Sequence, residues 1–333
     1  MKKTHIFILS FLLILLLLSG CGNITTDKII NSLEEIVMDV LDSPVDSDPE
    51  TIQEPADPEY QGQLQVHFID VGQGDAIFIK SPSHNILIDG GERGNTVLNY
   101  LEEQGIDELH LVIGTHPHSD HIGGLINILE SMPVTEVIDS GAVHTTKTFE
   151  DYLEVIDKKE IKYTEGRAGL ARHLGSGVSM QILHPSQASG SNLNDSSIVV
   201  KLTFGKISFM FTGDAEEASE KAILKRGYNL KSTFLKVGHH GSSTSTTDSF
   251  LSALDADAAI IMVGENNEYG FPHHETLSKL NDAHIDIYMT SVHGTIVITT
   301  DGQTYDINVK QPYQYTKGQE SEPEPEPDEP SEN

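Results

Sequence analysis

The stretch THPHSDHIGG, Thr115–Gly124, places three histidines and one aspartate within six consecutive positions. His116 and His118 are two residues apart, so in extended backbone their side chains leave on the same face and can bind one ion. Asp120 and His121 follow at once, where the chain must turn into a helical run, and this turn would direct them toward a second ion. Imidazole and carboxylate ligands suit zinc, manganese or iron. The stretch therefore predicts a two-metal site in one strand-to-helix turn.

Short β-branched or aromatic runs alternate with helical runs over residues 63–311. No linker-like stretch divides this region, so we predict one α/β domain with mixed sheets. The histidine cluster follows a buried strand, a setting that argues against the alternative of an exposed polar loop. Strands are predicted within 64–70, 75–80, 85–89, 109–115, 178–183, 196–204, 206–213, 232–238, 258–264, 285–289, 294–300 and 304–309, and helices near 95–105, 121–129, 216–226, 248–254 and 275–283.

The run His116-Pro117-His118-Ser119-Asp120-His121 resembles the defining motif of the metallo-β-lactamase superfamily. The resemblance implies a four-layer αββα sandwich in a single domain, with the metals at the sheet edge. Other stretches match in the same order, and several resemble the soluble hydrolase domain of ComEC-type competence proteins without their membrane channel. These stretches are FIDVGQGDAIFI (68–79), ILIDGG (86–91), NDSSIVVKL (194–202), FMFTGDA (209–215), FLKVGHHGS (234–242), YGFPHHE (269–275) and GTIVITTDG (294–302).

The resemblance also implies roles for individual residues. Asp214 would bridge two divalent ions, Zn or Mn, and Asp89 would support the ligands from behind. Asp75 is expected to do the same from the turn DVGQGDA (70–76), which lacks the residues of a phosphate-binding loop. The predicted ligands are His116, His118, Asp120, His121, Asp214 and His240.

Two adjacent histidines, His239 and His240, compete for one ligand position. On a strand they would point to opposite faces, so only one is expected to bind the ion. We favour His240 as the ligand and His239 as a catalytic acid that protonates a phosphoryl oxygen, alongside Asp120 as the other catalytic residue. A supporting partner or a capping residue is the alternative for either. His273, at the start of a predicted helix, is expected to contact an anionic substrate, with helix capping as the alternative.

One position departs from the superfamily pattern. The third histidine of the first metal usually comes from a His-x-x-x-Gly-Ser turn, and Asn194 occupies roughly that place in LNDSSIVV (193–200). An amide oxygen is a weaker, neutral ligand, so the first ion would be loosely held or completed by water or substrate near Asn194. His184 is an alternative ligand from sequence distance, or else a residue of a structural turn.

Two metal ions in such a site would activate water for hydroxide attack on a phosphodiester of DNA or of the cell envelope. The competing predictions are a lactam or lactone hydrolase and a non-catalytic metal-binding scaffold of an uptake apparatus. Residues 63–311 contain 33 acidic residues against 17 Lys and Arg, a formal net charge of −16. This acidity disfavours a deep basic groove for nucleic acid, although metal ions could still hold a phosphodiester.

The two ends of the chain differ from the middle. Residues 1–20 have the pattern of a signal peptide, and Cys21, the only cysteine, follows Leu-Ser-Gly as in the lipobox of bacterial lipoproteins. We expect a lipid on Cys21, an acidic tether over 21–62, and a disordered Glu/Pro-rich tail over 312–333. The chain is therefore predicted to be a secreted lipoprotein on the outer face of the cytoplasmic membrane, and the sequence indicates no stable protein partner.

Overall fold

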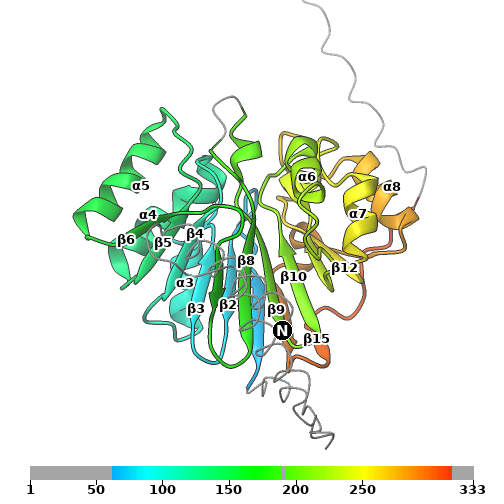
Figure 1. Cartoon of the computed structure of the whole chain (residues 1–333), viewed down its shortest axis with the longest axis horizontal. Helices are drawn as coiled ribbons and strands as arrows, with labels where there is room; N and C mark the ends of the chain where they lie inside the picture. Colours follow the sequence, from blue (N-terminus) through cyan, green and yellow to red (C-terminus); the bar gives the residue numbers. More distant parts are fainter. Residues whose placement is uncertain (1–61, 189–191, 317–333) are drawn as a thin grey trace, which may run out of the picture. The chain divides into compact units, whose positions relative to one another are not determined.

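The computed structural model describes residues 62–188 and 192–316 of the 333-residue chain. Within these ranges, a pair of β-sheets packs face to face, and helices cover the outer face of each sheet (Figure 1). This arrangement is the four-layer αββα sandwich predicted from the sequence, and the fold prediction is confirmed. The predicted signal peptide, Cys21 and nearly all of the predicted tether lie outside the described residues.

The first sheet is mixed and has eight strands. The strands β3 to β6 run parallel to one another, whereas β1, β2, β14 and β15 pair antiparallel. Three helices cover its outer face (Figure 1): α3 (Thr96–Glu103), α4 (Ser119–Ser131) and α5 (Lys147–Lys158). The spatial order is β15 (Tyr305–Ile307), β14 (Ile296–Thr300), β1 (Leu64–Phe68), β2 (Ile77–Lys80), β3 (Asn85–Ile88), β4 (Leu111–Gly114), β5 (Glu136–Asp139) and β6 (Lys162–Glu165).

The second sheet has seven strands, of which β10 to β13 are parallel. Its outer face carries α6 (Glu217–Leu224), α7 (Asp248–Leu254) and α8 (His274–Asp282) (Figure 1). The short helices are α9 (Thr290–His293), η1 (Asn194–Ser196) and η2 (Gly238–Gly241). The spatial order is β13 (Asp286–Met289), β12 (Ala258–Ile261), β11 (Phe234–Lys236), β10 (Ile207–Phe211), β9 (Val199–Phe204), β8 (Val178–His184) and β7 (Ala171–His173).

The central core lies between the two sheets. Alternate residues of each strand face inward, as the period of two in the sequence predicts. Phe68 of the first sheet lies against Phe211 of the second, with ring centroids 6.2 Å apart, and Phe209 stacks on both Phe211 and Phe234. The Phe68–Phe211 contact joins the two sheets, and the Phe209 contacts extend the aromatic cluster within the second sheet.

Close backbone packing sets the position of α4. Gly124 lies so near the Gly90 carbonyl that an added Cβ would clash with it, and the Gly90 N–H donates to the His121 carbonyl at 2.7 Å. The first turn of α4 also contacts the loop before β2. Gly74 has a φ of +123° and packs on the Asp120 backbone, and the Asp75 N–H donates to the Asp120 carbonyl at 3.1 Å. The turn around Gly74 is thus a packing turn against the metal motif, as the sequence analysis favours over a phosphate loop.

Several described segments extend the predicted element order. The strands β5, β6 and β7 and the helix α5 fill residues 136–173, which the sequence analysis leaves unassigned. The domain also continues past 311: Tyr313 N–H donates to the Ile287 carbonyl at 2.7 Å, and Tyr315 pairs with His274 at 2.6 Å. Among the described residues, none of the helices is long and apolar enough to cross a membrane.

Candidate metal centre

The predicted ligands come from the carboxyl ends of parallel strands in both sheets. His116 follows β4, Asp214 follows β10, and His240 lies in η2 just after β11. Asp120 and His121 occupy the first turn of α4, immediately beyond His118, which caps that helix. Because both sheets end here, residues about 100 positions apart in sequence meet at one edge of the sandwich.

His116 and His118 converge on one side of the cluster. Their side-chain nitrogens, Nε2 and Nδ1, lie 2.9 Å apart, and His116 Nε2 is 3.7 Å from Asp214 Oδ2. His116 is completely buried, whereas His118 is partly accessible. One ligand atom from each of His116, His121 and Asp214 falls within a 4.8 Å group that could hold a metal ion.

Asp120, His121 and His240 form the second group of the same size. His240 Nε2 lies 3.2 Å from Asp120 Oδ2 and 3.5 Å from Asp214 Oδ2. His121 Nε2 is 3.3 Å from the same Asp214 oxygen. Asp214 therefore lies between the two groups, the position expected of a bridging carboxylate.

The donor set fits divalent cations. His121 Nε2, His240 Nε2 and Asp214 Oδ1 are buried and lack hydrogen-bond partners, which is costly unless a cation satisfies them. Burial alone would lower the pKa of His240, but Asp214 and Asp120 raise it to about 9. Burial would likewise raise the pKa of Asp120, yet His121 and His240 hold it below its usual value. The carboxylates therefore favour positive charge here strongly, and Zn or Mn would supply it.

Residues behind the ligands hold the imidazole rings in place. Asp89 accepts from His121 Nδ1 at 2.8 Å, and His240 Nδ1 donates to the Met262 carbonyl at 2.9 Å. In both rings this leaves Nε2 facing the cluster, a common device for orienting metal-binding histidines. Asp75 also lies behind both rings, 3.4 Å from His240 Nδ1 and 3.9 Å from His121 Nδ1. Asp89 and Asp75 thus lie behind the rings, and with His121 they form a third group of the same size.

Lys236 is a buried cation that the sequence analysis does not single out. Its ammonium group pairs with Asp75, donates to the Gly213 carbonyl at 3.0 Å and lies 3.9 Å from Asp214 Oδ1. A lysine in the middle of the apolar run FLKVG (234–238) could have been noticed, because lysine is almost never fully buried without a partner.

His239 and Asn194 lie at the edge of the cluster. His239 and His240 both have positive φ, 47° and 52°, a conformation that non-glycine residues rarely adopt. His239 is about one-fifth exposed; its Nδ1 is 3.1 Å from Glu216 Oε1 and its Nε2 is 3.9 Å from Asp214 Oδ2. Asn194 Nδ2 lies 3.4 Å from His239 Nε2, and Asn194 Oδ1 is buried without a hydrogen bond. The structure thus puts His240 in the cluster and His239 beside it.

A pocket of about 460 Å³ opens above the cluster. Among its lining residues is His144, which the sequence analysis leaves without a role and whose ring lies 5.9 Å from that of His118. His273 is not among the lining residues, and its Nδ1 accepts from the Ser243 N–H at 2.9 Å. His184 also lies outside both ligand groups and donates to the Ser197 carbonyl, a structural contact. The pocket is lined by Gln73, His118, Ser119, Asp120, His144, Thr146, Thr148, Asp214, His239, His240, Tyr269 and Phe271.

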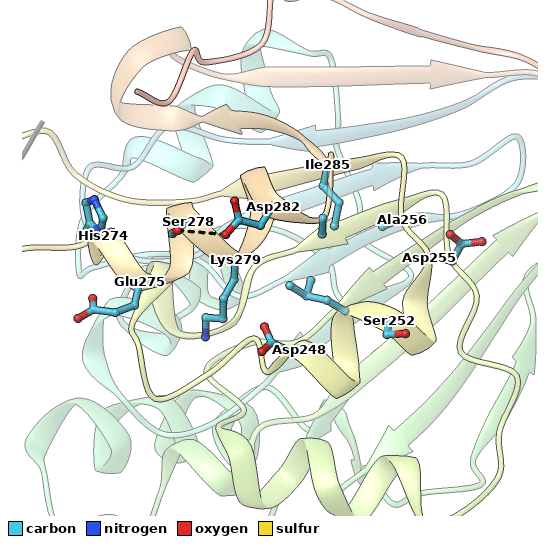
Figure 2. A pocket seen from close by; sticks show the side chains of 12 residues that line it. Asp248, Ser252, Asp255, Ala256, His274, Glu275, Ser278, Lys279, Asp282 and Ile285 are labelled. Atoms are coloured by element: carbon cyan, nitrogen blue, oxygen red, sulfur yellow. Dashed lines mark hydrogen bonds between the residues drawn. The ribbon is translucent and has the colours of Figure 1, made fainter. Parts of the chain in front are cut away.

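A larger pocket of about 780 Å³ lies between α7 and α8, away from the cluster (Figure 2). Asp248, Glu275 and Asp282 surround Lys279 there, and Ser278 donates to Asp282 at 3.5 Å. None of the residues predicted for the metal site lines it, so its size does not bear on the chemistry.

Comparisons with known proteins agree with this geometry. The sequence model of the metallo-beta-lactamase superfamily matches residues 69–265. The chain is 31% identical over 270 residues to ComE operon protein 3 of Bacillus subtilis and 34% identical over 239 residues to Recombination protein 2 of Haemophilus influenzae. These alignments cover 75% and 70% of this chain but 34% and 28% of the relatives, so the chain spans about a third of their length.

A solved structure shows the same fold. The metallo-beta-lactamase fold protein YhfI from Bacillus subtilis superposes with a TM-score of 0.51 at 12% identity, covering 72% of this chain and all of that protein. The superfamily model spans more than half of the chain, and the clustered histidines and aspartates lie within the matched residues. This chain therefore belongs to the metallo-β-lactamase superfamily.

Proposed function

We propose that this chain is a metal-dependent phosphodiesterase that acts on nucleic acid or on a phosphodiester polymer of the cell envelope. The observation that carries the proposal is the convergence of five predicted ligands in two groups below an open pocket, with His118 beside His116. Two divalent ions, Zn or Mn, would acidify a water molecule there and neutralise charge that develops on the phosphoryl group. The residues that would hold them are His116, His118, Asp120, His121, Asp214 and His240.

Side chains of the protein would position the metal ions and transfer a proton to the leaving group. Asp214 Oδ2 lies within 3.7 Å of nitrogens from His116, His121 and His240, which suits a carboxylate shared by two ions. His239 is accessible from the pocket, and Glu216 orients its ring through Nδ1. His239 Nε2 would then give a proton to the departing oxygen, and Asp120 would help to hold a metal ion.

The name of one relative favours a phosphodiester over a carbonyl substrate. That relative is Recombination protein 2, and recombination concerns nucleic acid. The predicted metal ions would serve either substrate class, and they would neutralise a phosphate in an acidic protein. The two competing functions are a lactam or lactone hydrolase and a non-catalytic scaffold. Each predicts a different result when hydrolysis and metal binding are measured.

We further propose that a lipid on Cys21 anchors the chain to the outer face of the cytoplasmic membrane. The support is the apolar run followed by Leu-Ser-Gly-Cys at 18–21. Metabolic labelling with radioactive palmitate in a bacterial host should mark the wild-type chain and leave Cys21→Ser unlabelled. Equal labelling of both chains would contradict the anchor.

The activity is tested with bis(p-nitrophenyl) phosphate, supplied with Mn or Zn. We expect metal-dependent hydrolysis that falls at least about 100-fold in Asp120→Ala, because a ligand and a catalytic carboxylate are lost together. The matched control is Asp157→Ala, which removes a carboxylate from the exposed face of α5.

Three outcomes separate the functions. Hydrolysis lost only in Asp120→Ala supports the phosphodiesterase. Hydrolysis of a lactam or lactone but of no phosphodiester would show a carbonyl hydrolase. Tight metal binding by the wild type with no turnover of either class would indicate a scaffold.

A further inference from the structure

Two aromatic side chains form one wall of the pocket above the metal cluster. The rings of Tyr269 and Phe271 are stacked, with centroids 5.4 Å apart and planes inclined by 17°. Tyr269 is 57% exposed, an unusual state for a large aromatic side chain that already has one ring face covered. The other face of Tyr269 is thus open for a flat partner.

The aromatic pair is continuous with the catalytic residues. The Phe271 ring lies 5.3 Å from that of His239 and 6.3 Å from that of His240. Tyr269 and Phe271 line the same pocket as Asp120 and Asp214. A group stacked on Tyr269 would therefore belong to a molecule that also reaches the metal site.

The loop that carries the pair is held in one conformation. Asn267 Nδ2 donates to the Gly264 carbonyl at 2.9 Å and to the Phe271 carbonyl at 2.7 Å, while its Oδ1 accepts from the Phe271 N–H at 2.9 Å. Gly264 N–H in turn donates to Gln73 across the pocket rim at 3.3 Å. A preorganised ring loses little conformational freedom when a ligand stacks on it.

The acidic surroundings of the pocket favour single-stranded over double-stranded nucleic acid. Burial and the nearby carboxylates of Asp120, Glu268 and Glu92 raise the pKa of the Tyr269 hydroxyl. Residues 63–311 have a formal net charge of −16. A duplex offers mainly phosphates and base edges, and its binding requires basic side chains that are scarce here. An unpaired base offers a flat face instead, and stacking on an aromatic ring depends little on sequence because every base has such a face.

We propose that Tyr269, backed by Phe271, stacks on an unpaired nucleobase next to the phosphodiester that is cleaved, so that the substrate is single-stranded nucleic acid. This inference rests on the proposed phosphodiesterase activity. It adds the form of the substrate and a residue that selects it.

The test compares a single-stranded oligonucleotide with an abasic oligonucleotide of equal length, which keeps the phosphodiesters and lacks the bases. Hydrolysis is measured with the full chain and Mn. In Tyr269→Ala we expect kcat/KM to fall about tenfold for the base-bearing strand and less than twofold for the abasic strand. Tyr269→Phe, which keeps the ring, should restore the preference for bases.

Tyr305→Ala is the matched control. It removes a Tyr that is 41% exposed and that touches Phe234 at the start of β11, whereas the metal cluster lies beyond the end of that strand. This variant should cleave both strands as the wild type does. Equal losses on both strands in Tyr269→Ala, faster cleavage of a duplex, or preference for a polyol-phosphate polymer would overturn the inference.

A binding measurement keeps the two proposals apart. Stacking quenches the fluorescence of a 2-aminopurine base, so the metal-free chain in EDTA should quench a labelled single strand more strongly than Tyr269→Ala does. If no phosphodiester is hydrolysed at all, the proposed function is wrong. The quenching measurement still tests whether Tyr269 stacks on a base, because it does not depend on hydrolysis. Equal quenching by the wild type and Tyr269→Ala would overturn the inference even for an active enzyme.

Discussion

The ammonium group of Lys236 lies directly behind the predicted metal ligands, and its side chain has no exposed surface. Burial raises the pKa of Asp75, while Lys236, His240 and His121 act in the opposite direction. A buried carboxylate that loses its cationic partner keeps the desolvation penalty without the attraction. Lys236 therefore offsets the buried negative charge of Asp75.

We expect Lys236→Met to lower the free energy of unfolding of the metal-free chain by about 3–5 kcal/mol, because Asp75 is left unpaired in the interior. The double variant Lys236→Met/Asp75→Asn should recover much of the loss, since it also removes the buried charge. Urea unfolding in EDTA measures both.

A surface ion pair provides the control for this prediction. Lys231 pairs with Asp255 at 2.6 Å, but both side chains are about 70% exposed. Lys231→Met should change the free energy of unfolding by less than about 1 kcal/mol. Similar losses at Lys231 and Lys236 would contradict the role assigned to the buried pair.

Asp139, the last residue of β5, has a pH-sensitive carboxyl group. Burial raises its pKa to about 6, although Gly141 N–H and Tyr163 donate hydrogen bonds to it. The unfolded chain has a pKa near 3.8, so the stabilising effect of the bound proton is fully present below that pH and is lost as pH rises through 6.

Relative to Asp139→Asn, the wild type should therefore lose about 2.4 kcal/mol of unfolding free energy between pH 4 and pH 7. The asparagine side chain has a similar shape and does not titrate, so it isolates this one group. Urea unfolding of both chains at each pH measures the difference. A constant difference across this range would show that the carboxyl group is not buried as described.

At the scale of elements, α4 is the helix on which the metal site depends. Gly123 and Gly124 let its backbone touch the loop after β3, and this contact puts His121 beside Asp89. The sequence HIGGLINIL predicts the helix from its apolar period, but nothing in that period indicates which backbone the two glycines meet.

We expect Gly124→Ala to lower the free energy of unfolding by at least about 2 kcal/mol, because the added methyl group meets the Gly90 carbonyl and must displace α4. Metal affinity should fall as well, since His121 lies one turn earlier on the same helix. Calorimetric titration with Zn and urea unfolding measure the two effects.

Gly94→Ala serves as its control, because a Cβ at Gly94 meets nothing within 4 Å. That variant should keep metal affinity and be as stable as the wild type or slightly more stable. An unchanged Gly124→Ala would mean that the close approach of α4 does not fix the site.

Strands at the edge of a sheet are hard to predict from apolar periodicity in the sequence. The strand β6, KYTE, has three exposed residues out of four, and β7, ARH, has two out of three, so neither carries an alternating apolar pattern. The helix α5 does have apolar residues at helical spacing, Phe149, Tyr152 and Ile156, and could have been predicted. Without these elements the sequence analysis could not place His144 near the site.

Across the molecule, the candidate metal ligands come from both sheets. Ligands from β4 and α4 on one side meet ligands from β10 and β11 on the other. An ion bound only by the folded arrangement stabilises the fold by mass action.

Added Mn or Zn should therefore raise the Tm of the chelator-treated chain, by about 1.4 kcal/mol in stability for each tenfold of free metal above the Kd. For a domain of this size that corresponds to a rise in Tm of about 3–6 °C per tenfold. Differential scanning calorimetry measures the shift. His240→Ala should respond less steeply, and a Tm independent of metal in the wild type would contradict a site shared by both sheets.

The residue patterns alone predict one α/β domain with mixed sheets, the succession of its main strands along the chain and the stretch at which the metals are predicted to bind. These features are local or repetitive: apolar runs with a period of two or 3.6 set the strands and helices, and THPHSDHIGG carries four ligands within one turn. The four-layer sandwich is what the resemblance to the superfamily implies. The resemblance to the superfamily added Asp214 and the pair His239 and His240.

Which of these side chains contact one another depends on the tertiary structure. The left-handed turn of η2 brings His240 into the cluster and leaves His239 at its edge. Lys236, Tyr269 and Phe271 join the site because two sheets pack face to face, and no pattern near those residues encodes that contact. The physical reason is that spacing along the chain fixes neighbours within an element, whereas core packing between sheets fixes neighbours across the molecule.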